Sequence, residues 1–374
     1  MPKLARLFFI LVLFAIFSCT GDQQVKENFA QSLANIQKKY APDLSLEVFD
    51  VRLEKSGGRW RVTGEVTSAR AAKAVRLLAD SLLKNYENRL TLLPDPTLGD
   101  SVYGIVKLSV AHLRREPRHA AELVDQVILG RPVKLLKRQR SWYLVQTEYR
   151  YIGWMTGYSF HRTDSAGAQQ WEKSPLYRVN TLFAEILSQP RANSPAISDA
   201  VMNATVKLLN GNKTWAKVAL PDGREGFIRR AYLSPVPKLD MNRLSGEQIT
   251  KTAKTLLGIP YLWGGNSAKA CDCSGFTQNV FRANGILLPR DARQQAKDGI
   301  AIIPQKDFSN VKPGDLLFFG PSEQKITHVG ISLGGYDFIH QDSDVHIDSF
   351  DSTATNYNAY RKKTLRKIKR ILKN

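Results

Sequence analysis

The sequence predicts an α+β protein of several domains, with small β-barrels in the middle of the chain and a mixed α+β domain at its C-terminal end. Three observations lead to this fold class: an internal repeat with strand-like alternation, a Gly-rich segment that passes into an apolar helix at Cys273, and a hairpin pattern further along. A chain of 374 residues is long enough for several such units.

Residues 1–19 have the pattern of an export signal. Lys3 and Arg6 precede an apolar run at 7–16 that is too short to span a bilayer comfortably. The following letters, IFSC, resemble the lipobox of bacterial lipoproteins, which implies that Cys19 becomes the lipidated first residue of the mature protein. Ordinary cleavage nearby is the alternative. We therefore expect an exported, membrane-anchored lipoprotein that faces the periplasm or the cell exterior of a bacterium.

Residues 20–100 form the next predicted unit. Strand-like patterns at 44–48 and 59–66 precede a helical pattern at 70–78, a succession that predicts a small α/β module. No group of residues in this unit has catalytic spacing, so we interpret it as a spacer or a docking unit.

An internal repeat occupies the middle of the chain. The letters VKLL occur at 133–136 and again at 206–209, and Trp142 and Trp215 follow at the same distance. Each copy alternates apolar and polar residues between turn signals, which is typical of short strands in a small β-barrel. The copies resemble bacterial SH3 domains, and we place the two barrels at 101–163 and 164–240.

Cys273 is the strongest candidate for a reactive group. A Gly-rich segment at 261–265 leads to Cys273, and an apolar pattern typical of a helix follows. The positive end of the helix dipole stabilises an anion, so we expect the pKa of this thiol to be lowered. The alternative is a small buried residue in a helix cap.

Three of the six histidines, His328, His340 and His346, follow Cys273 in the sequence. A cysteine nucleophile followed by its histidine base is the order expected for nucleophilic catalysis by a thiol.

A β-hairpin is predicted around Gly334 and Gly335, with the first two of these histidines on its two strands. A two-residue loop would bring Gln341 opposite His328. A three-residue loop pairs Ser332 with Tyr336 and brings His340 opposite His328, on the same face. We favour the second register, because a bulged loop containing glycine is common.

Five sequence blocks in one order resemble the NlpC family of papain-like cell-wall cysteine peptidases: PYLWGG at 260–265, DCSGF at 272–276, LPRDA at 288–292, PGDL at 313–316 and HVGI at 328–331. The resemblance covers roughly residues 244–374, within the domain predicted at 241–374. The expected fold is therefore a C-terminal papain-like cysteine peptidase domain preceded by two small SH3-like β-barrels and a small α/β N-terminal module.

This resemblance implies a catalytic triad with Cys273 as nucleophile, His328 as base and acid, and His340 as the residue that orients His328. His346 is a second candidate for the third role. Tyr261 is expected to donate to the oxyanion beside the Cys273 backbone N–H. No metal or other cofactor is required for this chemistry.

The first barrel looks like the version found ahead of NlpC peptidases that act on short muropeptides, where it helps to close the substrate site. By that resemblance Glu122 and Tyr151 contact the free amine of an N-terminal L-Ala; ordinary barrel surface residues are the alternative. Further substrate-binding candidates are Asp272, Ser274, Arg290 and Asp291, with Arg290 suited to a carboxylate. Arg293 departs from the small polar residue that the family pattern has there.

The formal net charge of +20 suggests nucleic acid as a first partner, but export argues against it. Peptidoglycan and anionic lipid are negatively charged as well. Cys271 is separated from Cys273 by one residue, too close for an unstrained disulfide, and the second cysteine pair or histidine set of a zinc site is missing. We interpret Cys271 as a bystander.

The predicted function is hydrolysis of the amide bond between γ-D-Glu and the diamino acid of peptidoglycan stem peptides or muropeptides, in murein recycling or turnover. Fragments with a free N-terminal L-Ala are the expected substrates. The alternatives are an endopeptidase on intact cross-linked wall, another cysteine chemistry such as acyl transfer or deamidation, and a non-catalytic wall-binding scaffold.

Overall fold

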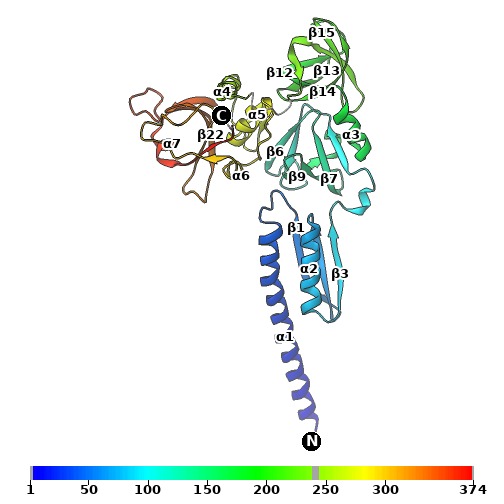
Figure 1. Cartoon of the computed structure of the whole chain (residues 1–374). Coiled ribbons are helices and arrows are strands. Elements are labelled where there is room, and N and C mark those ends of the chain that lie inside the picture. The colour runs from blue at the N-terminus through cyan, green and yellow to red at the C-terminus, as the bar shows by residue number, and fades with distance from the viewer. Residues whose placement is uncertain (1–2, 238–243, 373–374) are drawn as a thin grey trace. The chain divides into compact units, whose positions relative to one another are not determined.

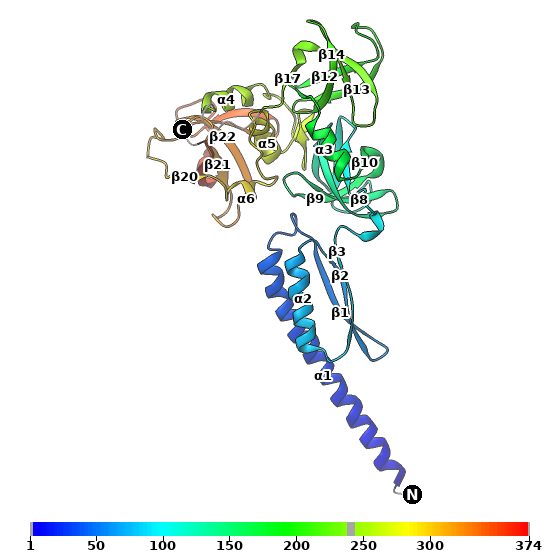
Figure 2. The ribbon, with the colours of Figure 1, turned by 45° about the vertical axis from the view of Figure 1, so that its right-hand side comes forward.

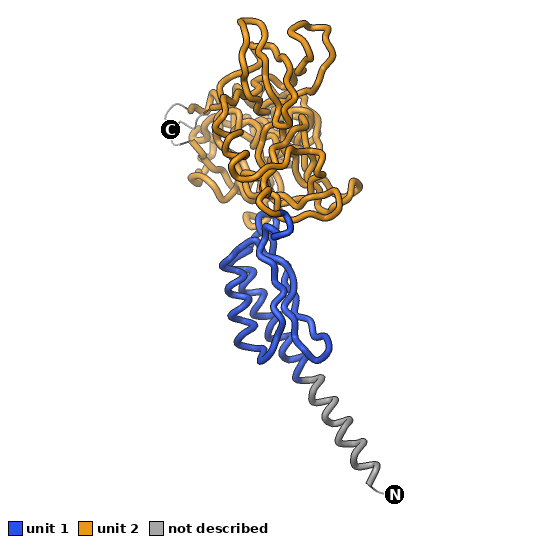
Figure 3. The backbone as a smooth tube through the Cα atoms, turned by 90° about the vertical axis from the view of Figure 1, so that its right-hand side faces the viewer, with its two compact units in different colours: residues 1–98 blue, residues 99–374 orange. Residues whose placement is uncertain are grey.

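The computed structural model describes residues 3–237 and 244–372, with side chains described from residue 21 onward. The chain divides into two compact units, Met1–Leu98 and Gly99–Asn374 (Figure 3). Cys19 and the apolar leader lie outside the residues whose side chains are described. Among the described helices, none is both long and apolar enough to cross a bilayer.

The first unit is a three-stranded sheet with two helices packed against it (Figures 1 and 2). Strand β1 (Phe49–Ser56) is antiparallel to β2 (Arg59–Val66), and β2 is parallel to β3 (Tyr86–Leu92). Helix α2 (Ala69–Leu82) connects the two parallel strands and packs against α1 (Lys3–Tyr40). A short helix, η1 (Pro96–Leu98), ends the unit. This arrangement is the small α/β module that the sequence predicts.

The prediction of a strand at 44–48 is wrong, because the first strand begins only at Phe49. The Asp43 carboxylate accepts hydrogen bonds from the backbone N–H and the hydroxyl of Ser45, and the Asp43 carbonyl accepts from the N–H groups of Leu46 and Glu47. An Asp side chain that bonds to the backbone two residues on stabilises a turn, which replaces the extended conformation here.

The second unit begins with two seven-stranded sheets of the same topology. In the first, the strand order is β10-β4-β7-β8-β9-β5-β6; in the second it is β13-β12-β16-β15-β14-β11-β17, which is the same order read from the other end. Corresponding strands are separated by one constant offset, as Pro132–Gln139 and Thr205–Gly211 illustrate. The repeat read from the sequence is therefore a repeat of structure.

The strands of the first barrel are β4 (Tyr103–Val106), β5 (Val110–Arg114), β6 (Leu123–Ile128), β7 (Pro132–Gln139), β8 (Trp142–Thr147), β9 (Ile152–Thr156) and β10 (Phe160–Thr163), with the short helix η2 (Gly157–Ser159) before β10. Helix α3 (Ser165–Lys173) connects the barrels. Those of the second are β11 (Leu176–Val179), β12 (Phe183–Leu187), β13 (Ala196–Val201), β14 (Thr205–Gly211), β15 (Trp215–Ala219), β16 (Glu225–Arg229) and β17 (Leu233–Pro235), with η3 (Arg230–Tyr232) before β17.

The C-terminal part of the second unit is a six-stranded antiparallel sheet with helices packed against it (Figure 2). Its strand order is β20-β25-β21-β22-β23-β24. The sheet strands are β20 (Ile300–Ala301), β21 (Leu316–Phe319), β22 (His328–Gly334), β23 (Asp337–Gln341), β24 (Val345–Ser349) and β25 (Leu365–Arg370). The other elements are α4 (Gly246–Lys254), β18 (Asn266–Ser267), β19 (Ala270–Cys271), α5 (Cys273–Ala283), α6 (Ala292–Gln295) and α7 (Ala359–Thr364). Together with the barrels, this sheet confirms the predicted α+β fold class.

The core of the C-terminal part lies between α5 and the middle of the sheet. Phe276 and Val280 of α5 are fully buried and pack in one cluster with Val329 and Ile331 of β22. Burial of such side chains contributes about 1.5–3 kcal/mol each. This packing fixes the first turn of α5 against the start of β22, where the candidate nucleophile and base lie.

Candidate active site

Cys273 is the first residue of α5, as the sequence predicts. Asp272 is the N-cap, and its carboxylate accepts a 2.7 Å hydrogen bond from the backbone N–H of Gly275. The cysteine side chain is buried, with 8% of the residue exposed. Its sulfur accepts backbone hydrogen bonds from Val329, which adjoins His328, and from Ser274. The thiol therefore lies at a helix N-terminus and beside the start of β22.

The predicted lowering of the thiol pKa is wrong for the free enzyme. Burial, followed by the negative charge of Asp272, raises the pKa of Cys273 to about 12, although the backbone N–H groups of Val329 and Ser274 act in the opposite direction. Burial, followed by the positive charge of Arg361, lowers the pKa of His328 well below its usual range. Both shifts favour a neutral Cys273 thiol and a neutral His328 imidazole, so proton transfer has to accompany the reaction with substrate.

The hairpin register also differs from the prediction. Gly330 pairs with His340 and Ser332 with Phe338, because a bulge between Ser332 and Gly334 adds a residue to the first strand. The favoured register, with Ser332 opposite Tyr336, is therefore displaced by two residues. A displacement of two keeps every side chain on its face. His328 and His340 consequently still share a face, as diagonal neighbours.

A chain of hydrogen bonds starts at His328. Its Nε2 lies 2.9 Å from Nδ1 of His340, and Nε2 of His340 lies 3.0 Å from Oδ2 of Asp348. The amide of Asn358 donates a further bond to the same Asp348 oxygen. Burial acts to raise the pKa of Asp348, but the hydrogen bonds from His340 and Asn358 lower it overall, so this residue is a carboxylate.

The carboxylate fixes the position of each proton in this chain. Because ionised Asp348 only accepts hydrogen bonds, His340 must carry its proton on Nε2, and its Nδ1 is then an acceptor. His328 therefore donates from its Nε2 to His340. In a neutral His328 this leaves Nδ1 without a proton, as the free basic nitrogen of the ring. We call Asp348, His340 and His328 the relay.

His346 lies behind the relay instead of within it. It pairs with His340 across β23 and β24, and the two ring centroids are 4.5 Å apart. Its Nε2 lies 3.6 Å from Oδ2 of Asp348, and its Nδ1 bonds to the carbonyl of Asp344. Nε2 of His328, the nitrogen that a third residue would contact, is bonded to His340 and not to His346.

Tyr261 lies close enough to Cys273 for a negative charge on that sulfur to act on the pKa of the phenol. Burial raises the pKa of the Tyr261 phenol, and the charges of Cys273 and Asp272 raise it further. The phenol consequently keeps its proton at neutral pH and remains a hydrogen-bond donor. The first N–H groups of a helix have no partner within the helix, so the Cys273 N–H is a second donor in the same region.

Arg290 is not available to a substrate, which corrects the prediction. It is 1% exposed, and its guanidinium forms 2.6 Å ion pairs with Asp125 of the first barrel and with Asp272. It also donates to the hydroxyl of Ser274, which in turn donates to Asp272. The side chains of Asp272, Ser274 and Arg290 are thus engaged with one another, and we assign them to holding the nucleophile turn against the barrel.

Glu122 and Tyr151 of the first barrel lie next to the peptidase part of the unit. The indole of Trp263 donates a 2.9 Å hydrogen bond to Glu122. Hydrogen bonds from Arg115 and Trp263 lower the pKa of Glu122, and the hydroxyl of Tyr151 bonds to Asp291. Arg115 lies within electrostatic reach of Glu122, Tyr151 and Asp291. The carboxylates of Glu122 and Asp291 and the phenol of Tyr151, all predicted from the sequence to bind substrate, therefore lie near one another.

Arg293, the departure from the family pattern, forms a 2.9 Å ion pair with Asp291. Asp291 is also the N-cap of α6, where its side chain and that of Gln294 form a capping box. Arg293 therefore holds the carboxylate of Asp291 from the solvent side.

Comparisons with known proteins give the family. Residues 258–370 match the model of the NlpC/P60 family, and residues 113–157 match that of the bacterial dipeptidyl-peptidase Sh3 domain. A protein of Lysinibacillus sphaericus named dipeptidyl-peptidase 6 is 30% identical over 257 residues, which are 66% of this chain and 91% of that protein. The chain belongs to the NlpC/P60 family. It is therefore a cysteine peptidase, as the sequence blocks predict.

Two further NlpC/P60 proteins are similar over much of the chain. A Bacillus subtilis protein named gamma-D-glutamyl-L-lysine dipeptidyl-peptidase is 31% identical over 230 residues, 58% of this chain and 71% of that protein. A crystal structure of an NlpC/P60 family protein from Bacillus cereus has a TM-score of 0.62 at 21% identity, and covers 72% of this chain and 99% of that one. The latter shows that the fold is shared.

Four residues of the site were missed by sequence reasoning. Asp348 ends the relay, Asn358 donates to Asp348, Asp125 pairs with Arg290, and Trp263 bonds to Glu122. Asp348 follows His346 by two residues in a strand-like segment, so alternation would have placed both on one face. Asp125 and Trp263 carried no comparable signal, because each acts across the contact between the first barrel and the peptidase part.

The Arg290 cluster predicts a large loss of stability on substitution. Arg290→Met leaves the carboxylates of Asp125 and Asp272 without their shared cation, and breaking a buried pair in this way costs about 3–5 kcal/mol. We expect lower urea and thermal unfolding midpoints for the full chain. The matched control is Arg293→Met, whose ion pair with Asp291 is partly exposed and contributes about 1 kcal/mol at most. Equal midpoints for the two variants would contradict the assignment.

Proposed function

We propose that this protein hydrolyses the amide bond between γ-D-Glu and the diamino acid in peptidoglycan stem peptides, with Cys273 as nucleophile. The observation that carries the proposal is the relay, which leaves Nδ1 of His328 as a free base at the start of β22, next to Val329, whose backbone N–H bonds to the Cys273 sulfur. The names of relatives indicate which amide bond is cleaved. The relatives in Bacillus subtilis and Bacillus cereus are called gamma-D-glutamyl-L-lysine dipeptidyl-peptidase.

The reaction begins as the substrate carbonyl approaches the thiol. Nδ1 of His328 takes the proton of Cys273 while the sulfur attacks the carbonyl carbon, and general base catalysis of this kind contributes about 10²–10⁴-fold. The Cys273 N–H and the Tyr261 hydroxyl donate to the oxyanion, where one such donor contributes about 10²–10³-fold. Protonated His328 then gives its proton to the leaving amine, and a thioester remains.

Water completes the cycle. His328 is neutral again after the amine leaves, so it accepts a proton from the water that attacks the thioester carbonyl. The γ-carboxylate of D-Glu and the thiol of Cys273 are the products of this step. Asp348 and His340 keep the basic nitrogen of His328 directed away from the relay throughout.

The first barrel, together with Asp291 of the peptidase part, supplies recognition of a free amine. Glu122 and Asp291 are carboxylates, and the Tyr151 hydroxyl lies beside Asp291. Ammonium groups bind well to such a set, because charge-assisted hydrogen bonds are about twice as strong as neutral ones. The hydrogen bond between Trp263 and Glu122 connects the barrel to the segment that precedes the nucleophile. This contact favours short fragments with an N-terminal L-Ala over intact cross-linked wall.

Acetylation of the substrate amine tests this recognition. L-Ala-γ-D-Glu-L-Lys is compared with the same peptide acetylated at L-Ala, and we expect kcat/KM to fall by about 100-fold, since bonds to a charged group contribute about 1.5–3 kcal/mol each. Glu122→Gln should lower kcat/KM for the free peptide by about 10-fold or more and leave the acetylated peptide almost unaffected. Glu116→Gln, an exposed neighbour paired with Arg118, is the matched control. Equal cleavage of both peptides would exclude the amine site.

Export and lipidation complete the proposal and are supported by the sequence alone. The charged start, the apolar run and Cys19 favour a lipoprotein anchored in a bacterial membrane. When the full chain is expressed in a bacterial host with labelled fatty acid, the protein should carry the label, and Cys19→Ser should lose it. Equal labelling of both proteins would rule out Cys19 as the anchor.

A further inference from the structure

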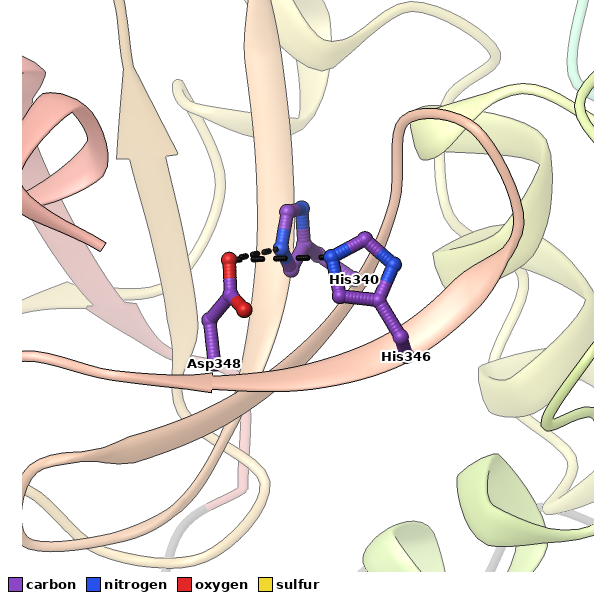
Figure 4. A group of neighbouring side chains, drawn as sticks. All are labelled: His340, His346 and Asp348. Atoms are coloured by element: carbon purple, nitrogen blue, oxygen red, sulfur yellow. Dashed lines mark hydrogen bonds and ion pairs between the residues drawn. The ribbon is translucent and has the colours of Figure 1, made fainter. Parts of the chain in front are cut away.

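We propose that His340, His346 and Asp348 form a binding site for a divalent transition-metal ion of the zinc class, and that the ion switches the peptidase off by reversing the relay. Figure 4 shows the three side chains, with His340 on β23, His346 and Asp348 on the facing strand β24, and both rings directed at the Asp348 carboxylate. The effect on catalysis rests on the function proposed above, whereas the binding site does not.

The three ligand atoms have the spacing of a metal site. Nε2 of His340 lies 3.0 Å from Oδ2 of Asp348, and Nε2 of His346 lies 3.6 Å from the same oxygen. All of the ligand atoms lie within 4.8 Å of one another. Tetrahedral zinc with bonds of about 2.0–2.2 Å needs ligand atoms about 3.3 Å apart. Two imidazoles and one carboxylate are a recurring zinc ligand set, with the fourth position left to water.

The surrounding hydrogen bonds orient two of the ligands in advance. Nδ1 of His346 donates to the carbonyl of Asp344, at 2.9 Å, which leaves its Nε2 as the lone-pair nitrogen facing Asp348. Asn358 holds the oxygen of Asp348 that both histidines face. Histidines that bind metals usually donate their other ring N–H to a carbonyl or carboxylate, and the partner fixes the ring.

The charge of the neighbourhood suits a cation. Besides Asp348, the Asp342 carboxylate lies 3.7 Å from Nε2 of His346, and that of Asp344 lies 3.3 Å from its Nδ1. Arg361 is the opposing charge, and it is paired with Asp342 at 3.1 Å. Access is from the side of His346, whose side chain is 32% exposed, while His340 is fully buried.

Binding of the ion would reverse the relay by changing which nitrogen of each ring carries the proton. In the free enzyme His340 carries its proton on Nε2 and accepts from His328 at Nδ1. An ion on Nε2 displaces that proton, and the neutral ring then holds it on Nδ1. His340 becomes the donor to His328, so Nε2 of His328 accepts and its single proton moves to Nδ1. The two rings keep two protons in total, but the base that Cys273 needs is lost.

Direct binding is tested first on the full chain carrying Cys273→Ala, which has no nucleophile. Calorimetric titration with Zn²⁺ should give one ion per chain. Adding His346→Ala or His346→Gln should weaken the affinity by about 100-fold or more, since outer partners alone account for about 10–100-fold. His161→Ala, which removes an exposed histidine of β10, is the matched control and should bind like its parent.

Activity is measured separately on chains that retain Cys273. Zn²⁺ should inhibit the wild type, and His346→Ala should keep its metal-free rate while resisting Zn²⁺ concentrations at least tenfold higher. Co²⁺ should show the same ligand-field absorption bands when it is bound to the Cys273→Ala chain as when it is bound to the chain that retains the thiol. Zinc binding that survives His346→Ala, or that needs Cys273, would overturn the inference. Absence of peptide cleavage with intact zinc binding would instead count against the proposed function.

Discussion

Cys273→Ala should lower hydrolysis of L-Ala-γ-D-Glu-L-Lys by about 10⁴-fold or more, because removal of the nucleophile from a covalent mechanism leaves only binding and oxyanion donors. Release of free lysine measures the rate. The buried position of the thiol at the start of α5, beside Tyr261 and the strand of His328, is the reason for so large an effect.

Cys271→Ala is the control for this result. Cys271 is also a buried free thiol, only two positions away, and its sulfur contacts the amide of Gln341 instead of the relay. We expect this variant to keep nearly the wild-type rate. A comparable loss in both variants would mean that the substitutions disturb the turn before α5, and the assignment of Cys273 as nucleophile would fail.

Asp348→Asn should lower kcat by about 10²–10⁴-fold, since replacing the carboxylate of a triad by an amide leaves the geometry in place but permits the wrong histidine tautomer. An amide can donate to Nε2 of His340, which places the His340 proton on Nδ1 and blocks the base of His328. KM should change little, because Asp348 is the end of the relay, bonded to His340 and Asn358, and it is not one of the residues proposed to bind the amine. Steady-state kinetics on the tripeptide separate the two constants.

Asp342→Asn is the matched control for this prediction. Asp342 is a carboxylate of the same neighbourhood, but it lies 3.8 Å from His340 and pairs with Arg361. We expect a loss much smaller than that of Asp348→Asn. If Asp342→Asn were as inactive as Asp348→Asn, the effect would come from the general negative field and not from the tautomer that Asp348 selects.

Much of the site could be predicted from the sequence because its signals are local. The Gly-rich entry, the Asp272 cap and the apolar pattern after Cys273 together specify the helix start that the structure contains. The repeat around Trp142 and Trp215 specified two sheets of one topology. The shared face of His328 and His340 was predicted as well, because alternation in a strand survives an error of two residues in register.

The remaining features depend on contacts between distant segments. The sign of the Cys273 pKa shift is set by burial, which no local pattern reports, so the helix dipole was given too much weight. Arg290 was assigned to a substrate carboxylate because its partner Asp125 lies in another domain of the same unit. Asp348 was overlooked because pairing of β23 with β24 brings it to His340.

The central claim is that Cys273 forms a thioester with the γ-carbonyl of D-Glu, and hydroxylamine tests it most directly. Added to the wild-type reaction with L-Ala-γ-D-Glu-L-Lys, it should intercept the thioester and yield the γ-hydroxamate of L-Ala-D-Glu, while lysine release continues; Cys273→Ala should yield none. Products that contain only the free acid at every hydroxylamine concentration, or a hydroxamate on the L-Ala carbonyl, would contradict the account.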